Sequence, residues 1–414
     1  LRQTSHNGRL DLQNSQLIVL WGGNPAWTAQ GNAMYYYLQA KRAGARFIFI
    51  DPYYNDSAMV LADEWVPVRP GTDHALALGM AYTLLEEDDP ATNPLVDWDF
   101  LNRLTVGFDG EHMPAGADPR DNVMDYVLGV RDGTPKTPEW ASRISGVSAP
   151  RIRRLAREIA RARRAALLTA WAPARTHNTD SWPQMFLTLG CMTGHIGQPG
   201  RMTGVSCWER TADGGPFLVG AGSSGEPPMR RVPRKTSARI NNSELWQAVL
   251  EGEYTAGEGE RRKVDLRAII HDGASALNQT SGLLKGIEAH RKAEFVLTLN
   301  FVYNTNARYS DMVLPVTTQW ERHSYFKGNR DHLIWARKVV EPQYETRDDS
   351  WIAAELGRRL GLDPEEMLPL SPEQEEFNRL AGAWVVAPDG GGREKLVTIT
   401  ARDIREMGVQ GEPQ

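Results

Sequence analysis

Two apolar segments that each stop at a turn beside an acidic residue constrain the fold of this chain more than any other feature. Phe47–Ile50 is followed directly by Asp51, and Glu64–Val68 is followed by a Pro-Gly turn and Asp73, where a helical pattern begins. Short apolar runs bounded by turns are typical of buried parallel strands. The pattern predicts two neighbouring strands that each present a carboxylate at one edge of a sheet.

Strands and helices alternate on both sides of these segments, and this order favours an α/β fold with mostly parallel sheets flanked by helices. Ser148 is expected to cap the helix that begins there, with Pro150 in its first turn. Residues 90–146 are rich in loops. The predicted elements are a strand from Leu17 with a turn at 22–25, a helix at 31–44, strands at 46–51 and 63–68, a helix at 73–89, the helix that begins at Ser148 and a strand from Ala165.

A later part of the chain repeats this pattern faintly. The strand Arg46–Asp51 resembles a strand predicted at 295–300, and the spacing to the next strand differs by one residue between the two copies. Internal repetition of this kind predicts two related Rossmann-like units. The aligned pairs are Asp51 with Asn300, Asp63 with Asp311 and Pro67 with Pro315.

Three domains are expected from this organisation. Residues 1–205 form a first dinucleotide-binding α/β domain, and residues 206–362 form a second α/β domain with a helix at 282–292. Residues 363–414 form a tail with one strand, at 395–400, that leads toward a cap domain outside the chain.

Composition excludes several classes of protein. With 414 residues and a net charge of −5, the chain is not expected to bind nucleic acid, so the arginines of segment 151–164 are interpreted as a solvated helix face. No apolar run reaches the roughly 18 residues of a membrane-spanning helix. Cys191 and Cys207 are too few to hold an iron–sulfur cluster, and they are interpreted as free thiols, with a disulfide left open.

Ligands of open α/β sheets bind beyond the carboxyl ends of the strands, which makes the two strand-end acids candidate binding residues. Gly22 and Gly23 allow a diphosphate to approach the backbone, and Asn24 offers an amide. Asp51 is placed to accept hydrogen bonds from ribose hydroxyls. Asp73 can accept two parallel hydrogen bonds, which the edge of guanine presents and that of adenine does not.

Other interpretations of these residues stay open. Asp73 can be a helix cap and Asp51 a turn former. No Gly-x-Gly-x-x-Gly follows the first strand, which argues against an NAD enzyme. His195 is interpreted as structural, and no zinc spacing or nucleophile elbow is found. Trp21, Trp27 and Trp171 stand at predicted strand ends, where they can line a pocket.

The motifs "VLWGGNPAWT", "FIDPYYNDSA", "VPVRPGTDHALALGMAY", "LGCMTGHIGQPG" and "ARYSDMVLPVTTQWER" occur in this order. Together they resemble the molybdopterin oxidoreductase (dimethyl sulfoxide reductase) family, and within it the catalytic subunits of anaerobic dimethyl sulfoxide reductases. The resemblance covers nearly the whole chain. Departures from the family pattern are Tyr53, Ala174, His195 and Asn300, which put single contacts in question.

The resemblance implies a molybdenum ion held by two molybdopterin guanine dinucleotides. No residue of this chain is expected to be catalytic or to ligate the metal, and any iron–sulfur cluster belongs to an upstream region or a partner subunit. The residues implied to bind cofactor in the first unit are Trp21, Gly22, Gly23, Asn24, Pro25, Asp51, Pro52, Gly71, Thr72, Asp73, Trp171 and Arg175, and those in the second unit are Gly273, Gln279 and Asn300.

The resemblance also implies an activity for the parent protein, the reduction of S-oxides or N-oxides such as dimethyl sulfoxide in anaerobic respiration. Electrons would come through an iron–sulfur subunit and a membrane anchor subunit, on the periplasmic face of a bacterial membrane. The chain resembles the central part of such a subunit and is expected to be inactive alone. The rival hypotheses are a cofactor-free scaffold of an electron-transfer complex, against which Asn24, Asp51 and Asp73 argue, and an NAD- or thiamine-type enzyme.

Overall fold

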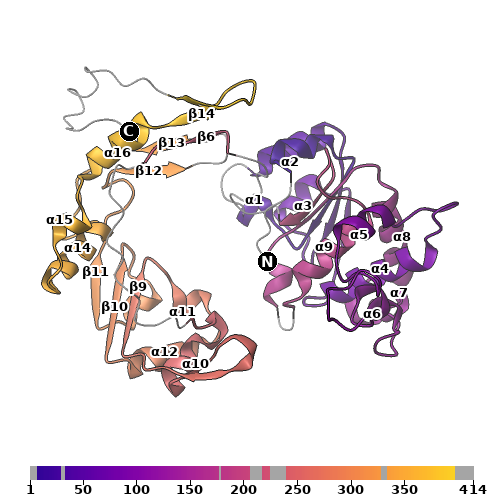
Figure 1. Cartoon of the computed structure of the whole chain (residues 1–414), viewed down its shortest axis with the longest axis horizontal. Coiled ribbons are helices and arrows are strands. Elements are labelled where there is room, and N and C mark those ends of the chain that lie inside the picture. The colour runs from indigo at the N-terminus through magenta and orange to yellow at the C-terminus, as the bar shows by residue number, and fades with distance from the viewer. Residues whose placement is uncertain are drawn as a thin grey trace. The chain divides into compact units, whose positions relative to one another are not determined.

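The structure is a computed structural model that describes residues 7–28, 33–176, 179–205, 217–223, 239–327 and 333–396. The chain forms two compact units, Leu1–Phe217 and Leu218–Gln414 (Figure 1). The predicted domain limits at 205 and 362 stay predictions.

Unit 1 is built on a five-stranded parallel sheet with the order β3-β2-β1-β4-β5. The chain adds β2 and β3 on one side of β1 and then returns to add β4 and β5 on the other side. Such a reversal of strand order leaves a crevice at the carboxyl ends of β1 and β4, where doubly wound folds bind ligands. The strands are β1 Leu17–Trp21, β2 Arg46–Ile50, β3 Glu64–Val66, β4 Ala165–Thr169 and β5 Met202–Val205.

Helices cover both faces of this sheet because alternate residues of its strands point to opposite faces. Val19 and Trp21 belong to a core with α4, α7, α8 and α9, whereas Ile18 and Leu20 belong to a core with α2 and α3 (Figure 1). The helices of unit 1 are η1 Arg9–Asn14, α1 Pro25–Thr28, α2 Ala33–Arg42, α3 Asp56–Leu61, α4 Asp73–Glu87, α5 Trp98–Leu104, α6 Val123–Leu128, α7 Pro138–Ser145, α8 Ala149–Arg161, η2 Ala172–Arg175 and α9 Trp182–Met192.

Unit 2 contains a three-stranded parallel sheet with the order β11-β10-β9. Helices α10 and α12 contact each other beside it (Figure 1). The sheet strands are β9 Ala268–Asp272, β10 Phe295–Asn300 and β11 Met312–Pro315; the helices are η4 Asn242–Glu244, α10 Leu245–Glu251, η5 Gly257–Gly259, α11 Ala276–Gln279, α12 Leu283–Lys292, α13 Thr305–Arg308, α14 Asp349–Arg359, α15 Pro364–Met367 and α16 Pro372–Ala381.

Short antiparallel strands complete unit 2. β14 pairs with both β6 and β15, β7 pairs with β8, and β12 pairs with β13. Their bounds are β6 Val219–Gly220, β7 Glu253–Thr255, β8 Arg261–Lys263, β12 Ser324–Lys327, β13 Leu333–Ala336, β14 Trp384–Val386 and β15 Arg393–Lys395.

The predicted fold class is confirmed, since both units have parallel sheets flanked by helices. β10 and β11 hold the places in unit 2 that β2 and β3 hold in unit 1. Asp63 accepts from the backbone N–H of Phe47 at 2.8 Å, and Asp311 accepts from that of Val296 at 2.8 Å. The repeat seen in the sequence is therefore also a repeat of hydrogen bonds.

Some local expectations need correction. Ser148 occupies the N-cap position of α8, but its side chain makes no capping bond. The loop-rich stretch 90–146 contains the three helices α5, α6 and α7. The tail holds α15, α16, β14 and β15 in its described part, while most of the strand expected at 395–400 lies outside the described residues.

Candidate functional site

A cavity of about 470 Å³ opens at the carboxyl ends of β1, β2 and β4, where the strand order reverses. The structure thus brings most of the predicted residues of unit 1 together, although they come from four separate parts of the chain. The predicted residues in its wall are Gly22, Asn24, Asp51, Pro52, Gly71, Asp73, Trp171 and Arg175, and the remaining predicted residues Trp21, Gly23, Pro25 and Thr72 lie next to them in the chain.

Asp73 is the most enclosed acid of this cavity. It opens α4, only 5% of its surface is exposed, and its Oδ1 accepts a hydrogen bond from Trp21 Nε1 at 2.8 Å. Burial raises the pKa of Asp73, while the Trp21 indole N–H opposes that rise. Thr72, rather than Asp73, holds the cap position of α4, and it makes no side-chain capping bond. The carboxylate of Asp73 accepts from the Trp21 indole and from its own backbone N–H.

The indole of Trp21 is itself packed against the aromatic side chains of α9. It is fully buried, and its ring centroid lies 4.9 Å from that of Trp182 and 6.1 Å from that of Phe186. Trp21 was predicted to lie in the pocket region, but its hydrogen bond to Asp73 was not predicted. No sequence signal links the two, because 52 residues separate them.

Asp51 forms the turn that its sequence context allows, and it also lines the cavity. Its Oδ1 accepts from the backbone N–H of Tyr53 at 2.8 Å, which is the bond of a turn former, and Oδ2 lies 3.4 Å from Asn55 Nδ2. Burial raises the pKa of Asp51, and the nearby charge of Asp73 adds to the rise. Asp51 therefore shapes the turn and also faces the cavity.

The glycine and amide contacts differ from the expectation. Gly22 donates its backbone N–H to Ile50 O at 2.8 Å, so this group is not free for a phosphate. Gly22 has φ +68°, and an added Cβ would lie 2.4 Å from Pro173 Cγ, which requires glycine. Asn24 Oδ1 accepts from Ser57 Oγ at 2.7 Å and so ties the loop after β1 to α3.

The segment that follows β4 contributes a positively charged residue, Arg175, to the wall of the cavity. The Arg175 guanidinium lies 5.6 Å from the ring centroid of Trp171, and both residues are exposed on the segment that follows β4. In the described part of the chain Arg175 forms no ion pair within 4 Å. Additional wall residues not expected from the sequence are Tyr53, Asn55, Pro70 and Thr176. Asn55 was detectable, since it caps α3 through Ala58 N–H.

Unit 2 repeats the hydrogen bonds that frame the cavity of unit 1. Gly273 and Gly22 have nearly the same φ, +65° and +68°, and Gln279 is exposed at the end of α11. The neutral Asn300 takes the place of Asp51. The matching bonds of unit 2 run from Gly273 N to Leu299 O at 3.0 Å, from Val302 N to Asn300 Oδ1 at 3.1 Å and from Ala307 N to Asn304 Oδ1 at 3.1 Å.

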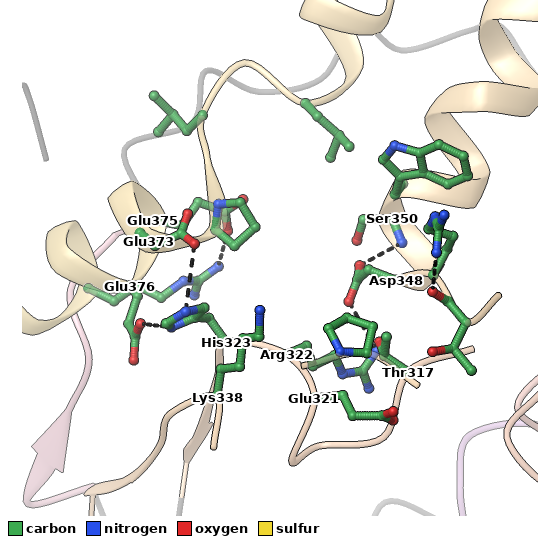
Figure 2. Close-up of a pocket in the computed structure, with 18 residues that line it drawn as sticks. Thr317, Glu321, Arg322, His323, Lys338, Asp348, Ser350, Glu373, Glu375 and Glu376 are labelled. Atoms are coloured by element: carbon green, nitrogen blue, oxygen red, sulfur yellow. Dashed lines mark hydrogen bonds and ion pairs between the residues drawn. The ribbon is translucent and has the colours of Figure 1, made fainter. Parts of the chain in front are cut away.

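A second cavity, of about 720 Å³, follows β11 in unit 2 (Figure 2). Glu321 in its wall stands six residues after Pro315, as Asp73 does after Pro67, but its carboxylate is fully used. Oε2 accepts from Thr318 N and Oγ1 at 2.8 and 2.9 Å, and Oε1 accepts from Gln343 N at 2.8 Å. Glu321 was not among the predicted site residues. Its six-residue spacing from Pro315, which matches that of Asp73 from Pro67, was the sequence signal that could have identified it.

His323 in the same cavity lies between two acids (Figure 2). Its Nδ1 is 2.7 Å from Glu376 and its Nε2 is 3.6 Å from Glu373. Among the described residues no group of three His, Cys, Asp or Glu side chains could hold a metal ion.

The remaining candidates have structural settings. His195 is buried, its Nε2 lies 2.9 Å from Ile159 O, and burial lowers its pKa, which agrees with the structural interpretation. Cys191 is a free thiol whose pKa burial raises to about 11, while Cys207 lies outside the described residues. In the described ranges no helix is both long and apolar enough to cross a bilayer.

Comparison with known proteins places the chain in a family. The model of the molybdopterin oxidoreductase family matches residues 2–359, so the chain belongs to this family, whose members bind a molybdopterin cofactor. The resemblance expected from the sequence motifs is confirmed. Relatives include dimethyl sulfoxide reductases and trimethylamine-N-oxide reductases.

Two relatives show the extent of the similarity. The chain is 32% identical to the dimethyl sulfoxide reductase DmsA of Haemophilus influenzae over 97% of its own length and 49% of that protein, and 33% identical to DmsA of Escherichia coli over 90% and 46%. It spans about half the length of the curated relatives it matches. The solved structure of acetylene hydratase from Pelobacter acetylenicus shares the fold, with TM-score 0.60 and 19% identity over 94% of this chain and 52% of that one.

Proposed function

We propose that this chain forms the central part of the catalytic subunit of a molybdenum enzyme that reduces S-oxides or N-oxides, such as dimethyl sulfoxide, in anaerobic respiration. The similarity to dimethyl sulfoxide reductases supports the substrate class. The observation that carries the proposal is the cavity of unit 1, where Asp51, directly after β2, and Asp73, at the start of α4, line the wall together with Arg175. The proposed cofactor is a bis(molybdopterin guanine dinucleotide), which when bound supplies the redox chemistry.

The residues of unit 1 fit the nucleotide part of such a cofactor. Asp73 is an enclosed acceptor for the N1–H and amino group of guanine, and Trp21 fixes its direction. Asp51 faces the same space as an acceptor for ribose hydroxyls. Arg175 offers a guanidinium to a phosphate or to the pterin side of the ligand. These are binding roles, so the chain contributes position and electrostatics rather than proton transfer.

Unit 2 is proposed to hold the second dinucleotide, through Gly273, Gln279 and Asn300. The repeated framing bonds support this assignment. Asn300 still offers an amide to a ribose, but without charge. The metal ligand and any iron–sulfur cluster are proposed to come from outside this chain. The proposed partners are an iron–sulfur subunit and a membrane anchor subunit, on the periplasmic face of a bacterial membrane.

Metal and nucleotide analysis of the full-length protein tests the proposal. The protein is produced anaerobically in a host that makes the cofactor. Molybdenum with two guanosine monophosphates released per metal, and reduction of dimethyl sulfoxide or trimethylamine N-oxide, are expected. Folded protein with neither metal nor guanine nucleotide would instead identify a cofactor-free scaffold. This chain alone is expected to show no turnover.

Asp73→Ala in the full-length protein separates the assigned guanine contact from the rest of the proposal. It removes an acceptor for two donors of guanine, so molybdenum content should fall. Asp51→Asn should lower it less, because the amide oxygen still accepts. Unchanged loading in Asp73→Ala protein would refute the guanine contact while leaving the family assignment intact.

A further inference from the structure

A third cavity, of about 540 Å³, lies in unit 1 between α5 and the loops that precede β4 and β5. Arg163 and Arg164 stand immediately before β4, and Arg201 stands immediately before β5. Because the strands are parallel, this cavity lies at the amino edge of the sheet. The candidate nucleotide cavity lies at the opposite edge, so the two are separate.

These three arginines differ from the rest of the arginine-rich segment 151–164. The other arginines of that segment are held by side chains on neighbouring elements; Arg153, for example, pairs with Glu139 at 2.7 Å. Arg163, Arg164 and Arg201 form no ion pair within 4 Å among the described residues. Arg164 Nε is buried without any hydrogen-bond partner, a costly arrangement unless an acceptor arrives.

The acids of the cavity do not neutralise these groups. Asp97 Oδ1 accepts from Phe100 N at 3.0 Å as the cap of α5, and Asp99 pairs with Arg103 at 3.4 Å. Four arginines and two aspartates line the wall, which leaves a formal excess of two positive charges. The cavity is therefore locally positive on a chain whose net charge is −5, and within the described residues Arg201 Nε is held only by the backbone oxygen of Arg163 at 2.8 Å.

We propose that this cavity binds a small polyvalent oxyanion of the diphosphate or phosphate-ester class. Planar guanidinium groups present paired N–H donors that match phosphate oxygens. Phe100, Leu104 and Ile196 also line the cavity and leave an apolar side for the organic part of a phosphate ester. The volume lies within the usual range of small-molecule sites, roughly 300–1,000 Å³. The inference does not depend on the proposed redox function.

Calorimetric titration of the chain with inorganic pyrophosphate at low ionic strength tests the site. One pyrophosphate is expected to bind per chain at this cavity, more tightly than inorganic phosphate. Arg163→Gln, Arg164→Gln and Arg201→Gln should each weaken binding by about tenfold, since each removes charged hydrogen bonds. Arg163 is exposed, and its substitution is expected to leave the fold intact.

Two control variants make the result specific. Arg153→Gln removes the same charge from the same segment and should leave pyrophosphate binding unchanged. Arg175→Gln, in the candidate nucleotide cavity, reports any pyrophosphate that binds there instead. Loss of binding in Arg175→Gln alone would move the anion to the nucleotide cavity and overturn the proposal. Equal weakening by Arg153→Gln, or no saturable binding, would also overturn it. If Arg164→Gln protein unfolds, Arg164→Lys, which keeps the charge but loses the paired donors, should still weaken binding.

Discussion

The contact between Trp21 and Asp73 gives the sharpest prediction, because the chain supplies its own control. Trp21→Phe keeps an aromatic ring in the stack but removes the N–H that donates to a buried carboxylate at 2.8 Å. Trp182→Phe makes the same chemical change 4.9 Å away, where the indole donates to the hydroxyl of Thr169 at 3.1 Å. Both tryptophans are fully buried. The two variants differ mainly in the charge of the acceptor.

The expected difference in stability between the two variants follows from the charge of the acceptor. A hydrogen bond to a charged group contributes about 1.5–3 kcal/mol to stability, and one between neutral groups about 0.5–1.5 kcal/mol. Trp21→Phe should therefore lower the free energy of unfolding by about 1 kcal/mol more than Trp182→Phe. Urea unfolding of both variants and wild type at neutral pH measures this difference. In a double-mutant cycle, Trp21→Phe should also couple to Asp73→Asn, whereas Trp182→Phe should not.

Equal losses in the two variants, or no coupling to Asp73→Asn, would refute the positioning role of Trp21. A second assay extends the argument to binding. If Asp73 reads guanine as proposed, Trp21→Phe should weaken guanosine monophosphate binding, and Trp182→Phe should weaken it less. Absence of guanosine monophosphate binding by wild type would count against the proposed nucleotide site but not against the stability result.

Two further predictions concern pH and backbone conformation. His271 and His290 are buried with their Nε2 atoms 2.8 Å apart, and the pKa of His271 is lowered to about 4. Its contribution to stability is complete above the unfolded pKa of 6.5 and is lost as pH falls toward 4, by at most about 3 kcal/mol. His271→Gln should flatten this part of the pH profile of chemical unfolding, and an unchanged profile would contradict it. Gly22→Ala should lower the melting temperature clearly more than Gly44→Ala. Both glycines have positive φ, but only Gly22 lies against Pro173, so only there would an added Cβ clash. Equal losses in thermal unfolding would show that the clash is relieved.

The sequence predicted those parts of the fold in which a local pattern decides the structure. β1, β2 and β10 are buried apolar runs with turns behind them, and α8 has a clear apolar stripe. The short helices α5, α6 and α7 were missed because tertiary packing, rather than periodicity, stabilises segments of six to eight residues. Ser148 stands at a cap position, but a suitable residue type did not guarantee the capping bond.

The candidate site was predictable in membership but not in detail. Ligands of open α/β sheets bind beyond the carboxyl ends of the strands, and this rule predicted that Asp51, Asp73 and Gly22 lie at one edge of the sheet. The three residues do line one cavity. The rule could not tell that the N–H of Gly22 is already used by Ile50. It also could not find the arginines at the opposite edge, because the paired and unpaired members of segment 151–164 look alike in sequence. Such distinctions depend on partners far away in the chain.

The repeat between the two units leads to a last prediction. Asp73 and Glu321, which stand at the same spacing after Pro67 and Pro315, should contribute to stability with opposite pH dependence. Asp73 is buried with its pKa raised, so its stabilising contribution is largest at low pH and falls as pH rises through the folded pKa. Glu321 has its pKa lowered by hydrogen bonds from Thr318 and Gln343, so its contribution is present at neutral pH and is lost as pH falls. At neutral pH, Asp73→Asn should therefore raise the melting temperature of the cofactor-free chain, and Glu321→Gln should lower it.

The opposite pH dependence of Asp73 and Glu321 bears on which of them can bind a ligand. An acid that destabilises the empty protein at neutral pH is available for a ligand with two donors, whereas an acid that already accepts hydrogen bonds from Thr318 and Gln343 is not. Thermal unfolding of both variants at neutral and acidic pH is the direct measurement. Destabilisation by Asp73→Asn would mean that its carboxylate is committed to the fold, as that of Glu321 is. The proposal that Asp73 of unit 1 binds guanine would then lose its main support, because Asp73 and Glu321 would no longer differ in their effect on stability.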